Sequence, residues 1–258
     1  MAKMKKGLII FLLGLWLTTP KVWALEVKHT IKTKIGFWDA CEETLTYAFY
    51  GDRDYDVKTS ILTSGTFGVL YPFSASYHTV GTYSKFDFKP QDYYYETQSR
   101  FRHRTKEIVY QDGVPQYRIS TKNEKKRKDK IETDSKYPVS VDLLSVFAGL
   151  AQRIRMKGDC DWEQYSFNGK KYAKSTVKTV KKEKIKTDYF SGKALKCRYK
   201  QEILEDTDAG FLLNPEEPIY FWVLKDEKTK VWFIAKVLIE NTPFGKLEAV
   251  TTKIEVKP

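Results

Sequence analysis

The stretch that most constrains the fold is residues 219–256, where short apolar runs alternate with turns. Residues 219–224 and 231–239 are rich in aromatic and β-branched side chains, and the charged segment 225–230 separates them. A turn at 241–245 precedes a last alternating run. Such runs, bounded by Asp, Lys, Pro and Gly, are typical of consecutive antiparallel strands. The sequence therefore predicts a three-stranded meander that closes the chain.

Both faces of residues 221–234 are apolar, so one face of this sheet must be covered and the other is either covered or faces a ligand. Trp222 and Trp232 fall on neighbouring strands of one predicted hairpin, where they can share a face. Without a ligand, the same aromatic side chains form the core. The residues that we expect on a ligand-facing surface are Phe73, Tyr77, Phe221, Trp222, Trp232 and Phe233.

The N-terminus has the pattern of a signal peptide. Residues 1–6 are lysine-rich, residues 7–17 are apolar, and Val22 and Ala24 are the small residues that precede a cleavage site. An uncleaved anchor is the alternative, but the apolar run is shorter than the 18 or so residues that a spanning helix needs. We expect cleavage after Ala24, a periplasmic or secreted protein, and no transmembrane segment in the mature chain.

The chain is basic, with a formal net charge of +12 over 258 residues. Removing residues 1–24, which carry four lysines and no acids, leaves 234 residues and a net charge of about +8. An exported protein rarely meets nucleic acid, so this charge favours an envelope polyanion or an acidic partner, with plain solubility as the alternative. Arg100, Arg102 and Arg104 alternate along a predicted strand and are candidates for anion binding; the alternative is a solvated face with acidic partners.

Period-two alternation predicts strands through most of residues 25–258, which we interpret as a single β-rich domain. One helix is predicted after Ser140, which can cap it, with Asp142 in its first turn. Residues 64–80 fit either a broken helix or a buried loop, and the lysine-rich residues 122–136 predict a mobile surface loop. A shift of the apolar face between Ala249 and Val250 predicts a bulge in the last strand.

Three cysteines allow at most one internal disulfide. We expect Cys160 to pair with Cys197, with no disulfide as the alternative, and Cys41 to be a small buried side chain.

The search for catalytic or metal-binding chemistry is negative. His29, His78 and His103 are isolated, and there is no paired Cys or His spacing for a metal. The three aspartates in residues 51–56 could form a calcium loop, but Val57 and Thr63 stand where an EF-hand has Gly and Glu, so a hairpin turn is favoured. No cofactor and no enzyme activity are predicted, although carboxylate pairs assembled in space leave no local signature.

The segments 35–36, 40–42, 142–145, 222–226 and 244–247 occur in the order and context of a known family. The chain resembles the bacterial domain-of-unknown-function family 3108 over almost all of the mature sequence. Cys41 stands where that family has a glycine, and Lys230 and Val231 stand where a proline is common. The resemblance implies an exported envelope protein whose strongly curved antiparallel sheet forms a half-open barrel, with one covering helix, and it supplies no activity.

Two functions fit these observations. In the first, the concave side of the sheet holds an apolar or amphiphilic, lipid-like ligand. In the second, the aromatic residues are core and a basic face docks onto an envelope polyanion or a protein partner. A cavity large enough for a ligand favours the first function, and a filled core with an exposed basic patch favours the second.

Overall fold

The computed structural model describes residues 24–51, 53–131, 140–169, 171–206 and 217–257. Fourteen strands form one antiparallel sheet in the order β8-β7-β6-β5-β4-β3-β2-β1-β14-β13-β12-β11-β10-β9. The strands are β1 (Ala24–Ile35), β2 (Trp38–Tyr50), β3 (Asp54–Thr63), β4 (Phe73–Ser84), β5 (Asp87–Ser99), β6 (Arg102–Gln111), β7 (Val114–Lys122), β8 (Lys125–Lys130), β9 (Trp162–Phe167), β10 (Lys171–Lys186), β11 (Ser191–Asp206), β12 (Ile219–Lys225), β13 (Trp232–Thr242) and β14 (Gly245–Lys257). The predicted closing meander is confirmed as β12, β13 and β14.

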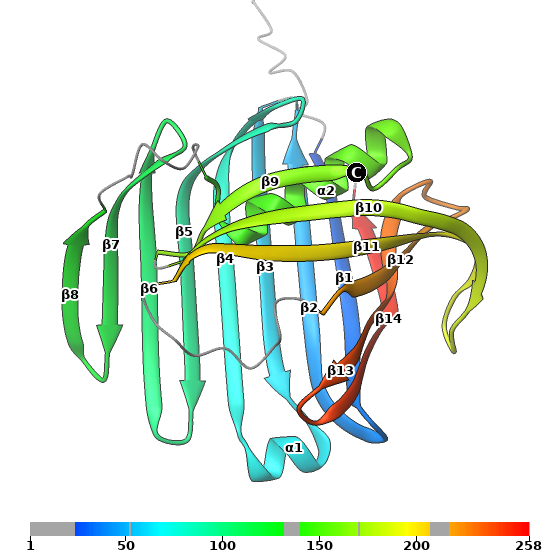
Figure 1. Cartoon of the computed structure of the whole chain (residues 1–258), viewed down its shortest axis with the longest axis horizontal. Helices are drawn as coiled ribbons and strands as arrows, with labels where there is room; N and C mark the ends of the chain where they lie inside the picture. Colours follow the sequence, from blue (N-terminus) through cyan, green and yellow to red (C-terminus); the bar gives the residue numbers. More distant parts are fainter. Residues whose placement is uncertain (1–23, 52, 132–139, 170, 207–216, 258) are drawn as a thin grey trace, which may run out of the picture.

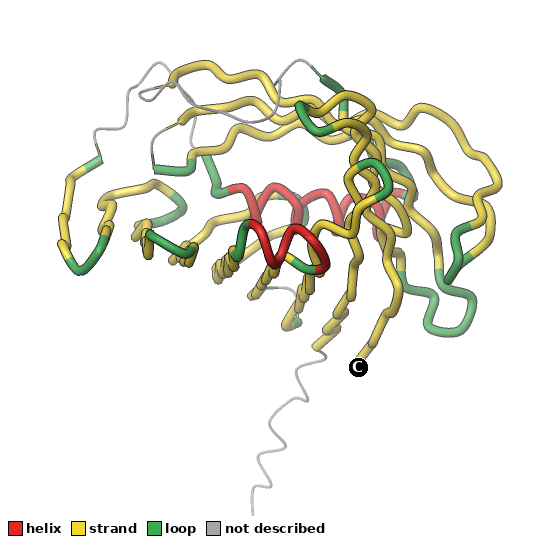
Figure 2. The backbone as a smooth tube through the Cα atoms, turned by 90° about the horizontal axis from the view of Figure 1, so that it is seen from below, coloured by secondary structure: helices red, strands yellow, loops and turns green. Residues whose placement is uncertain are grey.

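The sheet is strongly curved and does not close. Strands β1 to β8 form a broad layer, and β9, β10 and β11 run across it (Figure 1). The helix α2 (Leu143–Lys157) lies between these two parts of the sheet (Figure 2). The predicted fold, a mainly β half-open barrel with a covering helix, is therefore confirmed.

The first and last strands are neighbours. β1 pairs with β14 from Glu26 opposite Lys257 to Ile35 opposite Leu247. Between these ends the register shifts at Thr30 and Ile31, opposite Lys253 and Thr251, so Thr252 is the extra residue. The bulge of the last strand is therefore at Thr252, and the predicted position between Ala249 and Val250 was wrong. Both of those residues stay in register with β1 and with β13.

Asp142, rather than Ser140, is the N-cap of α2. Its side chain accepts a hydrogen bond from the backbone N–H of Ser145, and Gly158 ends the helix with φ of 70°, a left-handed conformation that suits glycine. The helix contacts both parts of the sheet. Leu144, Val146 and Ala148 pack in one cluster with residues of β1 to β6, whereas Leu150 and Ile154 pack in a second with Val177, Leu195 and Val223.

Three segments differ in whole or in part from the sequence predictions. Residues 65–70 form a short helix, α1 (Gly65–Leu70), in the segment where a broken helix was one alternative; it buries no residue, so the covering role belongs to α2. Residues 73–84 are neither a broken helix nor a loop but the strand β4. Residues 125–130 of the predicted surface loop form β8, an edge strand of the sheet. The remainder of that loop, residues 132–136, lies outside the described residues.

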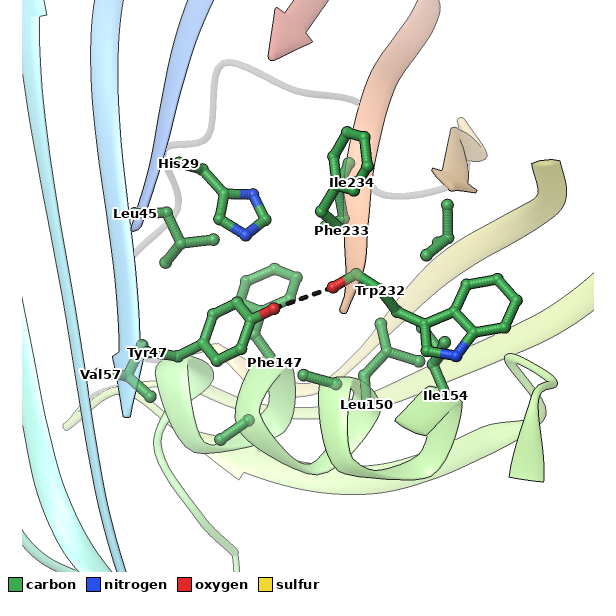
Figure 3. Close-up of a pocket in the computed structure, with 13 residues that line it drawn as sticks. His29, Leu45, Tyr47, Val57, Phe147, Leu150, Ile154, Trp232, Phe233 and Ile234 are labelled. Atoms are coloured by element: carbon green, nitrogen blue, oxygen red, sulfur yellow. Dashed lines mark hydrogen bonds between the residues drawn. The ribbon is translucent and has the colours of Figure 1, made fainter. Parts of the chain in front are cut away.

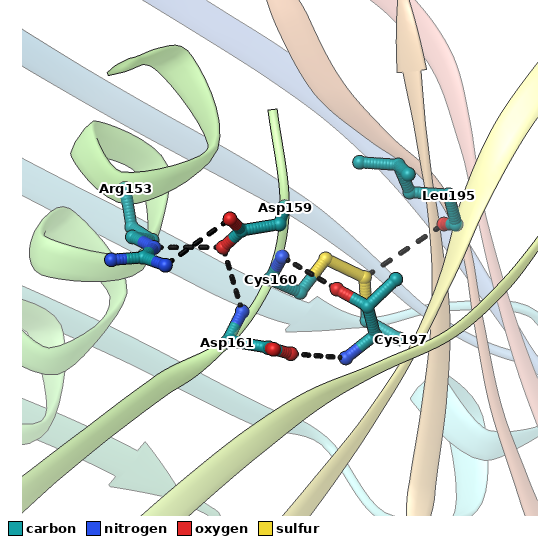
Figure 4. The surroundings of a disulfide bond; sticks show 7 residues. Arg153, Asp159, Cys160, Asp161, Leu195 and Cys197 are labelled. Atoms are coloured by element: carbon teal, nitrogen blue, oxygen red, sulfur yellow. Dashed lines mark hydrogen bonds and ion pairs between the residues drawn. A yellow bond between two sulfur atoms is a disulfide. The ribbon is translucent and has the colours of Figure 1, made fainter. Parts of the chain in front are cut away.

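Cys160 and Cys197 form a disulfide that ties the segment after α2 to β11 (Figure 4). Both cysteines are fully buried. The residues on either side are also held: Asp159 accepts a hydrogen bond of 2.7 Å from Nε of Arg153, and Asp161 accepts one of 2.8 Å from the backbone N–H of Thr179. The end of α2 is thereby fixed to β10 and β11.

Candidate functional site

A cavity of about 260 Å³ lies between α2 and the inner face of β9 to β13. Its volume is close to the lower end of the range for small-molecule pockets, about 300 to 1,000 Å³. Residues from six elements and the adjoining loops meet there, which is why no short sequence motif marks it. The lining residues are Leu143, Phe147, Ser166, Phe167, Asn168, Lys171, Ala173, Tyr199, Gln201, Ile203, Glu217, Ile219, Ile239 and Asn241.

The walls of this larger cavity are built from regular structure. Leu143 and Phe147 lie one helical turn apart on α2, and Ala173 pairs with Ile203 between β10 and β11. Tyr199 stacks against Phe147 with ring centroids 6.3 Å apart, and its hydroxyl lies 3.0 Å from that of Ser175. Burial raises the pKa of Tyr199, so its phenol stays neutral near pH 7.

Half of the residues that line the larger cavity are polar, Lys171, Gln201 and Glu217 among them, although most of the wall surface is apolar. Asn168 accepts a hydrogen bond of 3.0 Å from the backbone N–H of Lys171, and Asn241 donates one of 3.1 Å to Glu217. Asn168 follows β9, whereas Asn241 is near the end of β13. An apolar space with polar groups at different places along its wall suits a molecule with an apolar tail and a polar head.

A second cavity, beneath Trp232, is too small for such a ligand (Figure 3). Its volume is about 50 Å³, and a water molecule alone needs about 10 to 15 Å³. The Tyr47 hydroxyl donates a hydrogen bond of 3.0 Å to the Trp232 carbonyl across it. His29 also lines it; burial lowers the pKa of His29 to about 4, and neither ring nitrogen has a partner among the described residues. This side of α2 is packed core.

None of the six aromatic residues expected on a ligand-facing surface is among the residues that line the larger cavity. Trp232 and Phe233 line the small cavity, and Phe221 is buried in the cluster with Leu150 and Ile154. Phe73 is half-buried at the start of β4, opposite Ser99. Tyr77 stacks on Tyr95 with centroids 5.7 Å apart.

Trp222 and Trp232 do not share a face, so that prediction was wrong. Trp222 packs with Leu224 and Phe233, whereas Trp232 packs in the cluster of Phe221 and Val223. A register shift between Trp222 and Val223 lies between them along the hairpin. Trp222 is 6% exposed, and its indole donates a hydrogen bond of 2.7 Å to Glu183. Lys196 and Lys236 cover its ring at 5.0 and 5.7 Å, and the residue is therefore part of the packed sheet.

The three arginines that were predicted to alternate along one strand do not all lie on that strand. Arg100 lies in the turn between β5 and β6, with its guanidinium 5.8 Å from the ring of the neighbouring Phe101. Arg102 and Arg104 are on β6, two residues apart, and so point to the same side of the sheet. The sequence predicts one strand here because the turn lacks Gly, Pro, Asn and Asp.

The described residues contain no group of three or more His, Cys, Asp and Glu side chains placed to hold a metal ion. Asp56, from the segment considered as a calcium loop, instead lies 2.8 Å from Lys58 and 3.1 Å from His78. Within the part of the chain that the structure covers, no helix is both long and apolar enough to cross a membrane.

The wide apolar face of α2 was the one sequence signal that bears on the larger cavity. Leu144, Val146, Leu150 and Ile154 face the two core clusters, and Phe147 remains to line the cavities on either side. A helix that covers a single sheet face needs a narrower apolar stripe.

A family model described as "Protein of unknown function (DUF3108)" matches residues 30–252. No curated protein matches the chain. Among solved structures, the chain is similar to a β-barrel-like protein of the domain of unknown function DUF1849 from Brucella abortus. That similarity has a TM-score of 0.52 at 7% sequence identity, and covers 90% of this chain and 98% of the other. At this identity the similarity concerns the fold alone.

Proposed function

The chain belongs to the DUF3108 family, and we propose that this member is an exported binding protein that holds an amphiphile in the larger cavity. The observation that carries the proposal is the chemistry of that cavity, whose wall surface is mostly apolar and also includes polar side chains such as Asn168, Gln201 and Asn241. A single-chain amphiphile can place its tail against the apolar wall surface and its head group beside these polar side chains, so that neither part is buried without a suitable partner.

Export is part of the proposal and rests on the signal-peptide pattern of residues 1–24. An envelope protein meets lipids and other amphiphiles routinely. The aqueous space between membranes is also where an apolar tail needs a protein to shield it from water.

Titration with single-chain amphiphiles of graded length, followed by calorimetry, tests this proposal. The expected result is one binding site whose affinity rises with chain length until the cavity is full. Native mass spectrometry of protein purified from its own envelope then identifies a ligand that is already bound.

A matched pair of variants locates the site. Ala173→Leu adds side-chain volume to the wall of the larger cavity, whereas Ala151→Leu adds the same volume to the small cavity beneath Trp232. We expect Ala173→Leu to weaken binding by at least tenfold and Ala151→Leu to leave it unchanged, with both variants checked for folding by circular dichroism. Equal binding by all three proteins, or no binding to the wild type at any chain length, contradicts the proposal.

A further inference from the structure

The concave face of β6, β7 and β8 carries several cations, and three of them have no acidic partner among the described residues. Ile108 of β6 is fully buried in the cluster that contains Leu144 and Val146 of α2, so its side of β6 faces the inside of the half-barrel. Successive side chains of a strand point to opposite faces. Arg104 and Lys106 therefore lie on the same concave face as Ile108.

The strand register lines up three cations on this face. Arg104 of β6 is directly opposite Lys122 of β7, and Lys122 is directly opposite Lys125 of β8. We call these three residues the cation row. Like charges directly opposite one another destabilise a sheet. An arrangement that sets three of them side by side is thus stabilised by any anion that binds among them.

The cation row has no acidic partner among the described residues, although its neighbours do. Arg118 and Arg127, on the same face of β7 and β8, share the carboxylate of Asp129 at 2.7 and 2.6 Å. Glu124 lies in the turn between Lys122 and Lys125 but forms no ion pair with either. Nε of Arg104 is buried and without a hydrogen-bond partner in the described structure, a costly state for a guanidinium donor.

The concave face that carries the cation row is connected to the larger cavity through the turn after β9. Lys106 donates a hydrogen bond of 2.9 Å to the carbonyl of Asn168, which lines the cavity, and Arg118 donates one of 2.7 Å to the carbonyl of Gly169. Arg104 is two residues from Lys106 along β6, about 7 Å at the usual rise of a strand. A ligand whose tail lies in the cavity and whose head emerges at Asn168 therefore reaches the cation row.

We propose that the cation row binds the anionic head of the amphiphile, a phosphate or carboxylate. A guanidinium presents paired donors that match either oxyanion, and two ammonium groups beside it complete the neutralisation of a phosphate. This inference rests on the proposed function, because it assigns the head group of the ligand whose tail the cavity holds. It also places the anion site at Arg104, Lys122 and Lys125 instead of at Arg100, Arg102 and Arg104.

The test compares dodecyl phosphate, a neutral dodecyl polyoxyethylene ether, and inorganic phosphate alone, each titrated into the full mature chain by calorimetry. The expected result is that dodecyl phosphate binds at least tenfold more tightly than the neutral ether and that this preference decreases between 50 and 300 mM salt. Arg104→Gln and Lys125→Gln should each reduce the preference severalfold without changing the affinity for the neutral ether.

Lys126→Gln is the matched control, because Lys126 is adjacent to Lys125 and points to the opposite face of β8. It should leave the preference unchanged. Equal binding of the two dodecyl compounds overturns this inference and leaves the proposed function intact, whereas failure of both to bind overturns both proposals. Inorganic phosphate that binds the cation row as tightly as dodecyl phosphate identifies a free-anion site and overturns the head-group assignment.

Discussion

The hydroxyl of Thr79 on β4 lies 2.9 Å from the carboxylate of Asp142, the residue that caps α2. Ser145 binds the same carboxylate through its backbone N–H at 3.0 Å, and the Tyr55 hydroxyl lies 2.6 Å from that of Ser145. Because Asp142 is fully buried, this contact anchors the start of α2 to the first part of the sheet. The anchor also fixes the position of Leu143, the next residue, in the wall of the larger cavity.

Asp142→Ala is expected to lower the free energy of unfolding by about 2 to 4 kcal/mol. The loss of a helix cap costs about 0.5 to 2 kcal/mol, and a buried donor left without its acceptor costs about 1 to 3 kcal/mol. Denaturant titration of the wild type and the variant measures the difference. A change below about 0.5 kcal/mol would mean that the carboxylate does not anchor the helix.

Asp142→Asn keeps an acceptor for Ser145 and isolates the effect of charge. Burial raises the pKa of Asp142 above its ordinary value of 3.8, so the folded state holds this proton more tightly than the unfolded state. Its contribution to stability is therefore complete below pH 3.8 and is lost as the pH rises through the folded-state value. The stability of the wild type relative to Asp142→Asn should fall from pH 3.5 to pH 7, and a constant or rising difference would contradict this assignment.

Gly149→Ala should destabilise the protein, although alanine is favoured over glycine within a helix by about 1 kcal/mol. A Cβ at this position would lie 2.6 Å from Cζ2 of Trp162, whose rigid indole packs against α2. Thermal melts of the single variant, and of the same change in a Trp162→Ala background, check the cause. The sign should reverse in that background, and a stabilising effect in the wild-type background would show that the indole moves freely.

Trp222→Ala and Trp232→Ala should each lower the free energy of unfolding by about 3 to 5 kcal/mol, because each removes a large side chain from a packed cluster. Neither residue lines the larger cavity, so the affinity for a dodecyl amphiphile should stay within twofold at temperatures where the variants are folded. Denaturant melts combined with binding titrations separate the two effects. Weakened binding at unchanged stability would mean that these two residues are part of the ligand site.

Thiol counting on the denatured, unreduced protein should find one free thiol, that of Cys41, and three would mean that Cys160 and Cys197 are not joined.

In the native protein the thiol of Cys41 should react slowly near pH 8, because burial and the adjacent Glu43 raise the pKa of Cys41 to about 12. Reduction should destabilise the protein by about 4 kcal/mol, as the disulfide closes a loop over a sequence separation of 37.

N-terminal sequencing of exported protein should begin at Leu25, one residue after the start of β1. A protein that retains Met1 would contradict both the cleavage site and the proposed mature form.

Local sequence patterns were sufficient to predict a strand or a turn when its own residues carry the pattern. Asp112 and Gly113, with φ of 53° and 81°, make the turn between β6 and β7, and an Asp-Gly pair is a strong sequence signal for such a turn. The turn at Arg100 and Phe101 carries no such residues and was missed. Strand β8, with Lys125 and Arg127 on one face and Lys126 and Lys128 on the other, has no apolar face and resembles a loop in sequence.

The larger cavity could not be predicted from the sequence, for a different reason. Ile203 and Ile219 are ordinary strand residues in sequence, and their place in the cavity wall depends on the second part of the sheet crossing the first with α2 between them. Trp222, which was predicted to face a ligand, is a large side chain that fills a packed cluster.

The pairing of β1 with β14 also bears on how the two parts of the sheet join during folding. Strands β1 to β8 pair with their neighbours in the chain and can form as a meander before the remainder is available. The second part of the sheet joins the first when β14 forms its hydrogen bonds with β1. This pairing closes a loop of nearly the whole chain, and such long-range contacts form slowly. Until then β1 keeps an unpaired edge. Strand β14, the last strand of the described residues, is thus the one that joins the two parts of the sheet.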